Sequence, residues 1–184
     1  MAAEISYRII RSKRRTIALE INAAGEVLVR CPQRCTKAQI EAFVQSRAGW
    51  LQTHLQKRAA QPKLPPLSNE EVHALAKQAL EVIPGRVAHY APLVGVTYGH
   101  ITVRNQHSRW GSCSSQGNLN FNCLLMLTPP EVLDYVVVHE LCHRKEMNHS
   151  PRFWAEVARV LPDYQVQKKW LKDHGSALIA RLQP

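Results

Sequence analysis

The feature of the sequence that most constrains its fold is an H-E-x-x-H pattern at residues 139–143. His139 and His143 are four residues apart, so on a helix both imidazoles lie on one face and can reach a single ion. Glu140 follows the first histidine directly. Zinc binds imidazole nitrogen and keeps an open position for water where a protein supplies only three ligands. The pattern therefore predicts a helix that carries a metal site.

A third histidine, His149, follows His143 after a short interval. Asn148, just before it, is typical of a helix end, and Ser150-Pro151 is typical of an N-cap followed by proline at the first helical position. The chain is therefore expected to turn at the place where a third ligand must fold back toward the ion. This spacing predicts a catalytic metal site rather than a structural one.

The context of the pattern makes a chance match the weaker interpretation. Thr128-Pro129-Pro130-Glu131 has the form of a capping box with proline at the first helical position, which predicts a well-defined helix start. Residues 132–138 are apolar on nearly every face, as expected for a helix buried in a core. Polar side chains that emerge from a buried helix require a compensating partner, and a metal ion supplies one.

Length and composition indicate one globular domain, or one domain with a small appendage. The chain has 184 residues, of which 45% are hydrophobic and 21% are charged, and these are ordinary globular values. Its apolar runs are too short to span a bilayer, and we expect no secretory signal at its first residues. The five cysteines, Cys31, Cys35, Cys113, Cys123 and Cys142, form no C-x-x-C pair, and their odd number without an expected secretory signal predicts free thiols in a reducing cytoplasm.

The net charge of +10 is concentrated near the N-terminus. Residues 1–60 hold eleven Lys or Arg and four Asp or Glu, a net charge of +7, whereas the remainder holds thirteen and ten. Such a lobe attracts nucleic acid, nucleotides or an acidic partner, and its candidate anion-binding residues are Arg11, Lys13, Arg14 and Arg15. The alternative is a solvated face that keeps an edge strand soluble, because no aromatic-interleaved RNA-binding motif accompanies the charge.

Residues 61–67 are the strongest linker signal, because their prolines favour an extended spacer. They separate the basic lobe at residues 1–60 from a larger domain at residues 68–184. In the lobe we expect, in order, antiparallel strands from Ile5 to Cys31 with a turn at 22–25, and then a helix over residues 37–59 capped by Thr36.

The larger domain is expected to begin with a helix, because Ser68 to Glu71 has the form of a second capping box. An interruption of this helix is expected at Pro84-Gly85. Residues 101–127 predict two strands around a glycine-bearing loop. Three further helices are expected, at the metal motif, at residues 151–160 and at residues 164–173.

Three further groups of residues accompany the metal motif: Trp110-Gly-Ser-Cys113, Asn118-Leu-Asn-Phe121 and Phe153-Trp154. Together with the three histidines they resemble the YgjP-like metallopeptidase domain family, a relative of SprT-type zinc proteins, along nearly the whole chain. The resemblance implies an α+β, zincin-like domain in which a small antiparallel sheet lies beside the H-E-x-x-H helix, after a small N-terminal β lobe and helix. It also implies one zinc ion per chain with a catalytic Glu140 and the ligands His139, His143 and His149.

Two neighbouring families share parts of the pattern. The histidine spacing also matches the metzincin pattern, but Glu146 stands where that pattern has glycine, and no methionine follows Met147 to make the required turn. Gluzincins take their third ligand from a later helix, where Glu156 is the candidate close by. His149 is the preferred third ligand, because imidazole keeps the ligand set neutral and because this residue lies at the expected helix break.

The leading functional hypothesis is a cytoplasmic zinc-dependent peptidase. A zinc ion on three histidines lowers the pKa of its water from ~15.7 towards ~7, and Glu140 accepts the proton and returns it to the leaving group. If the strand from Asn118 to Cys123 is the sheet edge at the cleft, a peptide substrate pairs with it by strand addition. The candidate substrate-binding residues are Arg109, Asn118, Asn120 and Arg144.

Two alternative functions stay open at this stage. The resemblance brings an association with UTP pyrophosphatase activity, which a metal near Arg109, Arg144 and Lys145 would suit, although no glycine-rich phosphate loop is present. The other alternative is a nucleic-acid-associated, SprT-like protein that binds through the basic lobe, with an affinity that falls steeply with salt. The sequence sets neither the substrate nor the oligomeric state.

Overall fold

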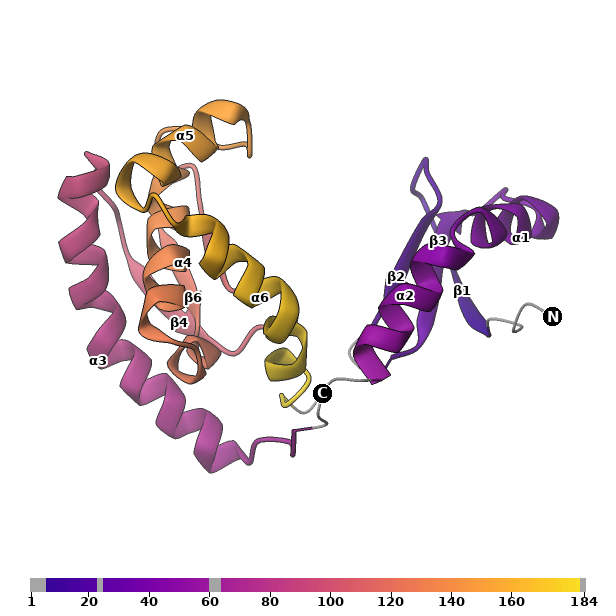
Figure 1. The fold of residues 1–184 in the computed structure, drawn as a ribbon, viewed down its shortest axis with the longest axis horizontal. Helices are drawn as coiled ribbons and strands as arrows, with labels where there is room; N and C mark the ends of the chain where they lie inside the picture. Colours follow the sequence, from indigo (N-terminus) through magenta and orange to yellow (C-terminus); the bar gives the residue numbers. More distant parts are fainter. Residues whose placement is uncertain (1–5, 23–24, 60–63, 183–184) are drawn as a thin grey trace. The chain divides into compact units, whose positions relative to one another are not determined.

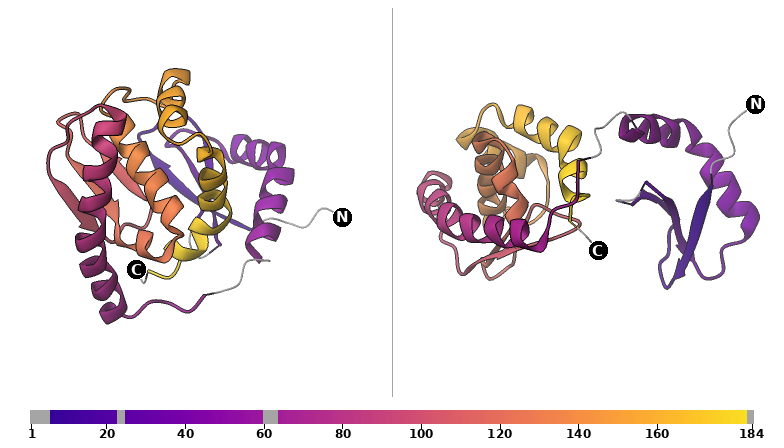
Figure 2. Two further views of the ribbon diagram at one scale, coloured as in Figure 1. Left: turned by 60° about the vertical axis from the view of Figure 1, so that its left-hand side comes forward. Right: turned by 90° about the horizontal axis from the view of Figure 1, so that it is seen from below.

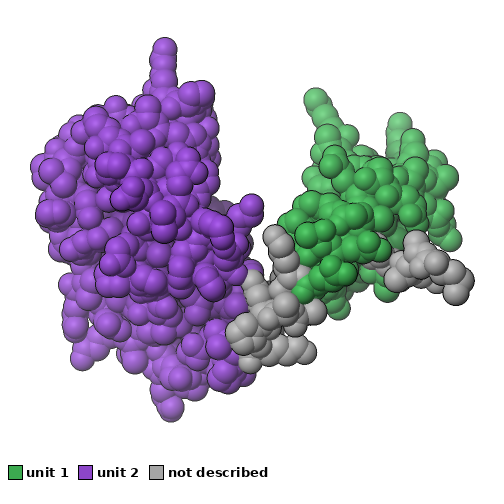
Figure 3. Space-filling model, viewed as in Figure 1, with its two compact units in different colours: residues 1–63 green, residues 64–184 purple. Residues whose placement is uncertain are grey.

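The computed structural model describes residues 6–22, 25–59 and 64–182. The chain divides into two compact units, residues 1–63 and residues 64–184 (Figure 3). Residues 61–63 of the expected linker lie outside the described residues, as do Ile5 at the expected start of the first strand and residues 23–24 of the expected turn. Each unit has a hydrophobic core of its own.

The N-terminal unit contains a three-stranded sheet in the order β1-β3-β2 (Figure 1). Its strands are β1 (Tyr7–Ser12), β2 (Ala18–Ile21) and β3 (Val27–Pro32). β2 and β3 are antiparallel, as predicted, but β1 and β3 are parallel, so the prediction of an entirely antiparallel sheet is wrong. The reason is that β3 inserts between β1 and β2, and alternating hydrophobicity indicates which face of a strand is buried but not which strand lies beside it.

Two helices follow, α1 (Lys37–Ser46) and α2 (Ala48–Ala59). Thr36 caps α1, as predicted, and the structure shows that the cap is a capping box completed by Gln39. The single helix expected over residues 37–59 is interrupted at Arg47, whose φ of −113° and ψ of 9° leave the helical region in a tight turn. The interruption allows both helices to contribute to the core of this unit, which consists of Val27, Val29, Cys31, Ile40, Val44 and Leu51.

The second unit begins with a long helix, α3 (Asn69–Val94), which Ser68 caps in the predicted capping box. The interruption expected at Pro84-Gly85 is wrong, because α3 continues through both residues. A proline inside a helix removes one backbone donor. Ile83 and Val87, on either side, are fully buried, and their packing against the core offsets the lost hydrogen bond.

The sheet of the second unit consists of β4 (Ile101–Arg104), β5 (Gly111–Cys113) and β6 (Leu119–Asn122), in the order β4-β6-β5. β6 is therefore the central strand, and the expectation that the strand from Asn118 to Cys123 lies at the sheet edge is wrong. β6 pairs in parallel with β4 and antiparallel with β5, so the sheet is mixed rather than antiparallel. An alternating strand with one covered face has the same sequence pattern at an edge as in the centre, which is why the sequence did not distinguish them.

The metal-motif helix, α4 (Pro130–Cys142), follows a short 3-10 helix, η1 (Cys123–Leu127). Pro130 takes the first helical position, as predicted, but the expected capping box is wrong. The N-cap is Pro129, and the Thr128 hydroxyl faces the preceding turn, where it donates to the carbonyl of Leu125. The start of α4 therefore relies on proline geometry rather than on a side-chain cap.

α4 lies between α3 and the last helix, α6 (Tyr164–Ile179), in the views of Figures 1 and 2. α5 (Pro151–Val160) begins at the predicted Ser150 N-cap, whereas α6 extends beyond its expected end at residue 173. The core between α3, α4 and the sheet includes the fully buried Val137 and Val138. This arrangement confirms the predicted α+β class, with the metal-motif helix beside a small sheet.

The segment after the undescribed residues 60–63 is attached to the end of α6. The backbone N–H of Leu67 donates to the Arg181 carbonyl, and the Arg181 guanidinium donates to the Pro65 carbonyl. Leu67 is buried in a small cluster with Leu124 and Leu182. Residues 64–67 of the expected linker therefore pack on the second unit.

Among the described helices, none is both long and apolar enough to span a bilayer.

Candidate metal centre

Three histidine side chains converge where α4 ends. His139 lies in the last turn of α4, His143 is its C-cap, and His149 directly precedes the N-cap of α5. One ring nitrogen from each lies within 4.8 Å of the others, and the Nε2 atoms of His139 and His149 are 3.0 Å apart. The structure thus brings together the three residues that the sequence predicts as ligands.

The turn after α4 brings His149 back to the helix. The backbone N–H groups of Arg144 and Lys145 donate to the carbonyls of Leu141 and Cys142, which closes the last turn of α4. A second reversal follows, in which the Asn148 side chain accepts a hydrogen bond from the backbone of Ser150. The Ser150 hydroxyl then caps α5 by accepting from the backbone N–H of Phe153. The start of α5 is the one that Ser150-Pro151 predicts. The prediction that Asn148 ends the metal-motif helix is wrong, because α4 ends at Cys142.

The donor set fits a divalent metal. The Nδ1 of His143 donates to the Glu146 carbonyl at 3.1 Å, which fixes its tautomer and leaves the lone pair on Nε2. The Nδ1 of His139 is buried without a hydrogen-bond partner among the described residues. The Nε2 atoms of His139 and His149 face each other at contact distance, an arrangement that a shared ion satisfies better than a single shared proton.

Electrostatics favours neutral imidazoles at this site. Burial, together with the charges of His143, His149 and Lys168, lowers the pKa of His139 to about 3. Burial also lowers the pKa of His143. Metal binding requires the deprotonated form of histidine, so the fold already holds both side chains in the form that binds an ion.

Aromatic rings pack around the three imidazoles. The buried Phe153 of α5 lies 4.8 Å from His139, 4.6 Å from His143 and 4.8 Å from His149 between ring centres. Trp154 stacks on His149 at 5.6 Å. These contacts restrict the orientation of each ligand ring. The sequence alone does not predict this role of Phe153 and Trp154.

The side chain of Glu140 extends from α4 toward β5. Its side chain is 5% exposed and packs against Gly111, where an added Cβ would lie 2.7 Å from Oε1 of the carboxyl group. Burial raises the pKa of Glu140 to about 8, and the positive charge of Arg109 opposes this rise. A carboxyl group with a raised pKa beside a metal site is suited to accept and donate protons near neutral pH.

Most of the predicted substrate-binding residues are engaged elsewhere in the fold. Arg144 donates to the carbonyls of Thr97 and Ser115. Asn118 accepts from the backbone of His100, and Asn120 donates weakly to the Ser112 hydroxyl at 3.4 Å. These contacts hold the loops around β5 and β6. Arg109 is exposed, and its charge acts on Glu140.

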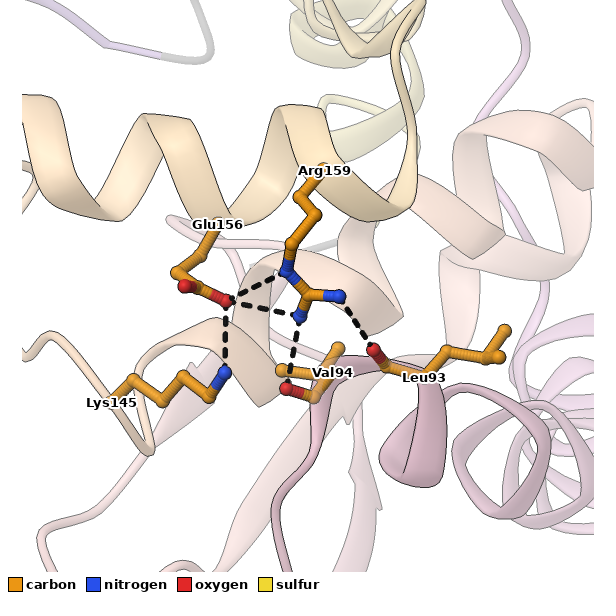
Figure 4. Close-up of polar contacts among 5 residues, drawn as sticks. All are labelled: Leu93, Val94, Lys145, Glu156 and Arg159. Atoms are coloured by element: carbon orange, nitrogen blue, oxygen red, sulfur yellow. Dashed lines mark hydrogen bonds and ion pairs between the residues drawn. The ribbon is translucent and has the colours of Figure 1, made fainter.

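Glu156, the alternative third ligand, has two other partners (Figure 4). Its carboxylate accepts from Lys145 at 2.9 Å and from Arg159 at 3.0 Å, and hydrogen bonds from both cations lower its pKa. Arg159 also donates to the carbonyls of Leu93 and Val94 at the end of α3. Glu156 therefore ties α5 to α3 and to the turn after α4, and it stands outside the histidine cluster.

The basic residues of the N-terminal unit have mixed environments. Arg11 donates from one nitrogen to the carbonyls of Pro32, Gln33 and Cys35, so its guanidinium holds the chain after β3. Arg14 is half-buried, and its Nε atom has no partner among the described residues. Lys13 and Arg15 are exposed. The hydrogen bonds of Arg11 compete with its predicted role in anion binding. For Lys13, Arg14 and Arg15, anion binding stays a prediction.

Comparison with protein families decides the class of the chain. The model of the YgjP-like family, described as a metallopeptidase domain, matches residues 15–75 and 67–174. The chain belongs to this family. Membership confirms the sequence prediction of a metal-dependent hydrolase and agrees with a divalent metal at the histidine cluster.

Two solved structures are similar to part of the chain. The metallopeptidase zymogen abylysin of Pyrococcus abyssi is 20% identical, with a TM-score of 0.46, over 50% of this chain and 93% of its own. The metallopeptidase zymogen jannalysin of Methanocaldococcus jannaschii is 19% identical, with a TM-score of 0.40, over 48% of this chain and 94% of its own. No curated protein matches the chain in sequence.

Proposed function

We propose that the chain is a zinc-dependent peptidase that holds one zinc ion on His139, His143 and His149. The observation that carries this proposal is the convergence of three imidazoles within 4.8 Å of one another beside the buried carboxyl group of Glu140. Membership of a metallopeptidase family supports the reaction class. Zinc is the metal of choice because three neutral imidazoles with an open position form its usual catalytic donor set.

The substrate is a peptide bound in an extended conformation along β5. Among the described strands, β5 pairs only with β6, so it is an edge strand of the sheet. An extended peptide adds to such an edge by backbone hydrogen bonds. Because Glu140 packs against Gly111 of β5, a peptide on this edge passes beside the carboxyl group.

Glu140 is the general base and later the general acid. When bound, zinc supplies Lewis acidity that activates a water molecule and polarises the scissile carbonyl. Glu140 accepts the proton of the attacking water and delivers it to the leaving amine nitrogen. Its contact with Gly111 holds it in place. His143 is kept in the ligating tautomer by the Glu146 carbonyl.

The cysteine content supports a cytoplasmic location for this activity. All five cysteines are free thiols, and Cys31, Cys123 and Cys142 are buried. Free thiols in this number are usual in a reducing compartment, whereas secreted proteins oxidise such residues to disulfides. We therefore propose that the enzyme acts in the cytoplasm.

The test compares zinc-loaded wild type with Glu140→Gln on a mixture of peptides prepared from digested cell protein. We expect new peptide termini, found by mass spectrometry, with wild type only, while both proteins hold one zinc per chain. Loss of the base should lower the rate on the order of 100-fold or more. Equal cleavage by the two proteins would refute the role of Glu140. Release of UMP and diphosphate from UTP, with no peptide cleavage, would refute the peptidase.

A further inference from the structure

A lysine lies on the aromatic side of the histidine cluster. Lys168 belongs to α6, and its Nζ atom is 3.6 Å from the centre of the Trp154 ring. The same indole stacks on His149, with planes 22° apart, and its centre lies 5.8 Å from that of His139. Lys168 therefore holds its ammonium group one aromatic ring away from two of the proposed zinc ligands.

The ammonium group of Lys168 has no carboxylate partner in the part of the chain that the structure describes. Its neighbour Lys169 forms an ion pair with Asp173, and Lys145 forms one with Glu156. Lys168 is exposed and contacts the indole face instead. Contact with an aromatic face displaces part of the hydration shell of the ammonium group, which strengthens its attraction for an incoming anion.

Positive charge acts on the site from two elements. Lys168, on α6, holds its ammonium group over the Trp154 ring that stacks on His149. Arg109, just before β5, is exposed. A site under the field of two cations attracts anionic substrates and orients them.

We propose that Lys168 determines specificity by binding a carboxylate of the peptide substrate. The carboxylate is an Asp or Glu side chain near the scissile bond, or the free C-terminus of a short peptide. This inference rests on the proposed peptidase function and adds its substrate class. In this proposal the peptide pairs along β5, where Glu140 packs against Gly111, and its carboxylate binds the Lys168 ammonium group that lies over the Trp154 ring.

The first experiment uses the peptide mixture from digested cell protein, before and after chemical amidation of all carboxyl groups. We expect zinc-loaded wild type to cleave the untreated mixture about tenfold faster, because a charge-assisted hydrogen bond is lost on amidation. Equal cleavage of both mixtures would overturn the role of Lys168 and leave the peptidase in place. No cleavage of either would overturn the peptidase, and this inference with it.

The cleavage positions separate the two sources of the carboxylate. Sites that cluster beside Asp and Glu, at any distance from the peptide end, would assign the side chain. Sites at a fixed short distance from the C-terminus, whatever the neighbouring residues, would assign the terminal carboxylate. Sites that show neither pattern would contradict recognition of a carboxylate.

Variants of Lys168 test whether the side chain itself recognises the carboxylate. Lys168→Met keeps an unbranched apolar stem over Trp154, and we expect an about tenfold lower kcat/KM on the untreated mixture with little change on the amidated one. Lys168→Arg should restore much of the difference. The matched control, Lys169→Met, removes a neighbouring surface charge whose partner is Asp173, and should behave as wild type. An equal loss on both mixtures would indicate packing of Trp154 only and would overturn the proposal.

A binding measurement removes the dependence on turnover. Zinc-loaded Glu140→Gln is titrated with one glutamate-containing peptide from the mixture and with its amidated form. We expect about tenfold weaker binding of the amidated peptide, and no difference between the two when Lys168→Met is added to the same protein. The same affinity for both peptides without that second substitution would contradict carboxylate recognition.

Discussion

Gly111 of β5 lies directly against the side chain of Glu140 on α4. A Cβ placed on Gly111 would be 2.7 Å from Oε1 and 2.8 Å from Cγ of Glu140, which is closer than real Cβ contacts allow. The missing side chain therefore allows the edge strand and the metal-motif helix to approach each other. The distance between a bound peptide and the carboxyl group of Glu140 depends on this approach.

Gly111→Ala should displace Glu140 and slow peptide cleavage while the zinc content stays at one per chain. Misplacement of a catalytic group by about 1 Å lowers the rate on the order of 100-fold. Steady-state kinetics on a single peptide and metal analysis of the same preparation check this prediction. The comparison variant is Gly85→Ala in α3, where the added Cβ has no atom within 4 Å apart from its chain neighbours and the nearby backbone of its own helix. It should leave the rate unchanged and stabilise the helix by about 0.5–1 kcal/mol. Wild-type activity in Gly111→Ala would contradict the proposed contact.

His149→Ala should lose most of its zinc, whereas Glu156→Ala should keep it. His149 supplies one of the three converging nitrogen atoms, while the carboxylate of Glu156 is held by Lys145 and Arg159. Removal of a ligand lowers zinc affinity by several orders of magnitude, and removal of Glu156 leaves the three imidazoles in place. Elemental mass spectrometry of both variants after dialysis distinguishes them. Zinc retained by His149→Ala and lost by Glu156→Ala would reverse the assignment.

Local hydrogen-bond signals in the sequence predicted several helix starts, although the capping box expected before α4 is wrong. The Thr36 cap, the capping box at Ser68 and the Ser150-Pro151 start are all present. Each depends on residues within three positions of one another, so the sequence contains all the information that they need. The placement of His139 and His143, four residues apart at the end of α4, is a local signal of the same kind. The return of His149 follows from the start of α5 immediately after it.

Relationships between distant segments could not be predicted in the same way. β6 is the central strand because β4 pairs with it in parallel. Alternating hydrophobicity in a strand does not indicate which other strands lie beside it. Gly111 lies in the Trp110-Gly-Ser-Cys113 group, but its role depends on Glu140 in another element. The continuity of α3 through Pro84 depends on packing against the rest of the core. Tertiary packing overrode the local signal there.

Asp134→Ala should destabilise the second unit by about 1–3 kcal/mol without loss of zinc. Asp134 is 8% exposed on α4, and its carboxylate accepts hydrogen bonds from Arg86 at 2.6 Å and from Tyr90 at 3.0 Å, both on α3. Its removal leaves a half-exposed guanidinium and a buried hydroxyl without their partner. Urea unfolding monitored by tryptophan fluorescence measures the change in the free energy of unfolding. Glu131→Ala, an exposed substitution in the first turn of the same helix, should change it by less than about 0.5 kcal/mol.

Glu156 should make part of the stability depend on acidic pH. Hydrogen bonds from Lys145 and then Arg159 lower its pKa in the folded state below the ordinary value of a glutamate. A group whose pKa is lowered by folding contributes stability above the pKa of the unfolded state, about 4.3, and loses that contribution as the pH falls through the lower folded pKa. The difference in free energy of unfolding between wild type and Glu156→Gln should therefore be largest near neutral pH. It should shrink steadily below about pH 4. Urea titrations of the metal-free proteins at several pH values measure it, and a difference that grows on acidification would show that the two cations do not stabilise the charged form.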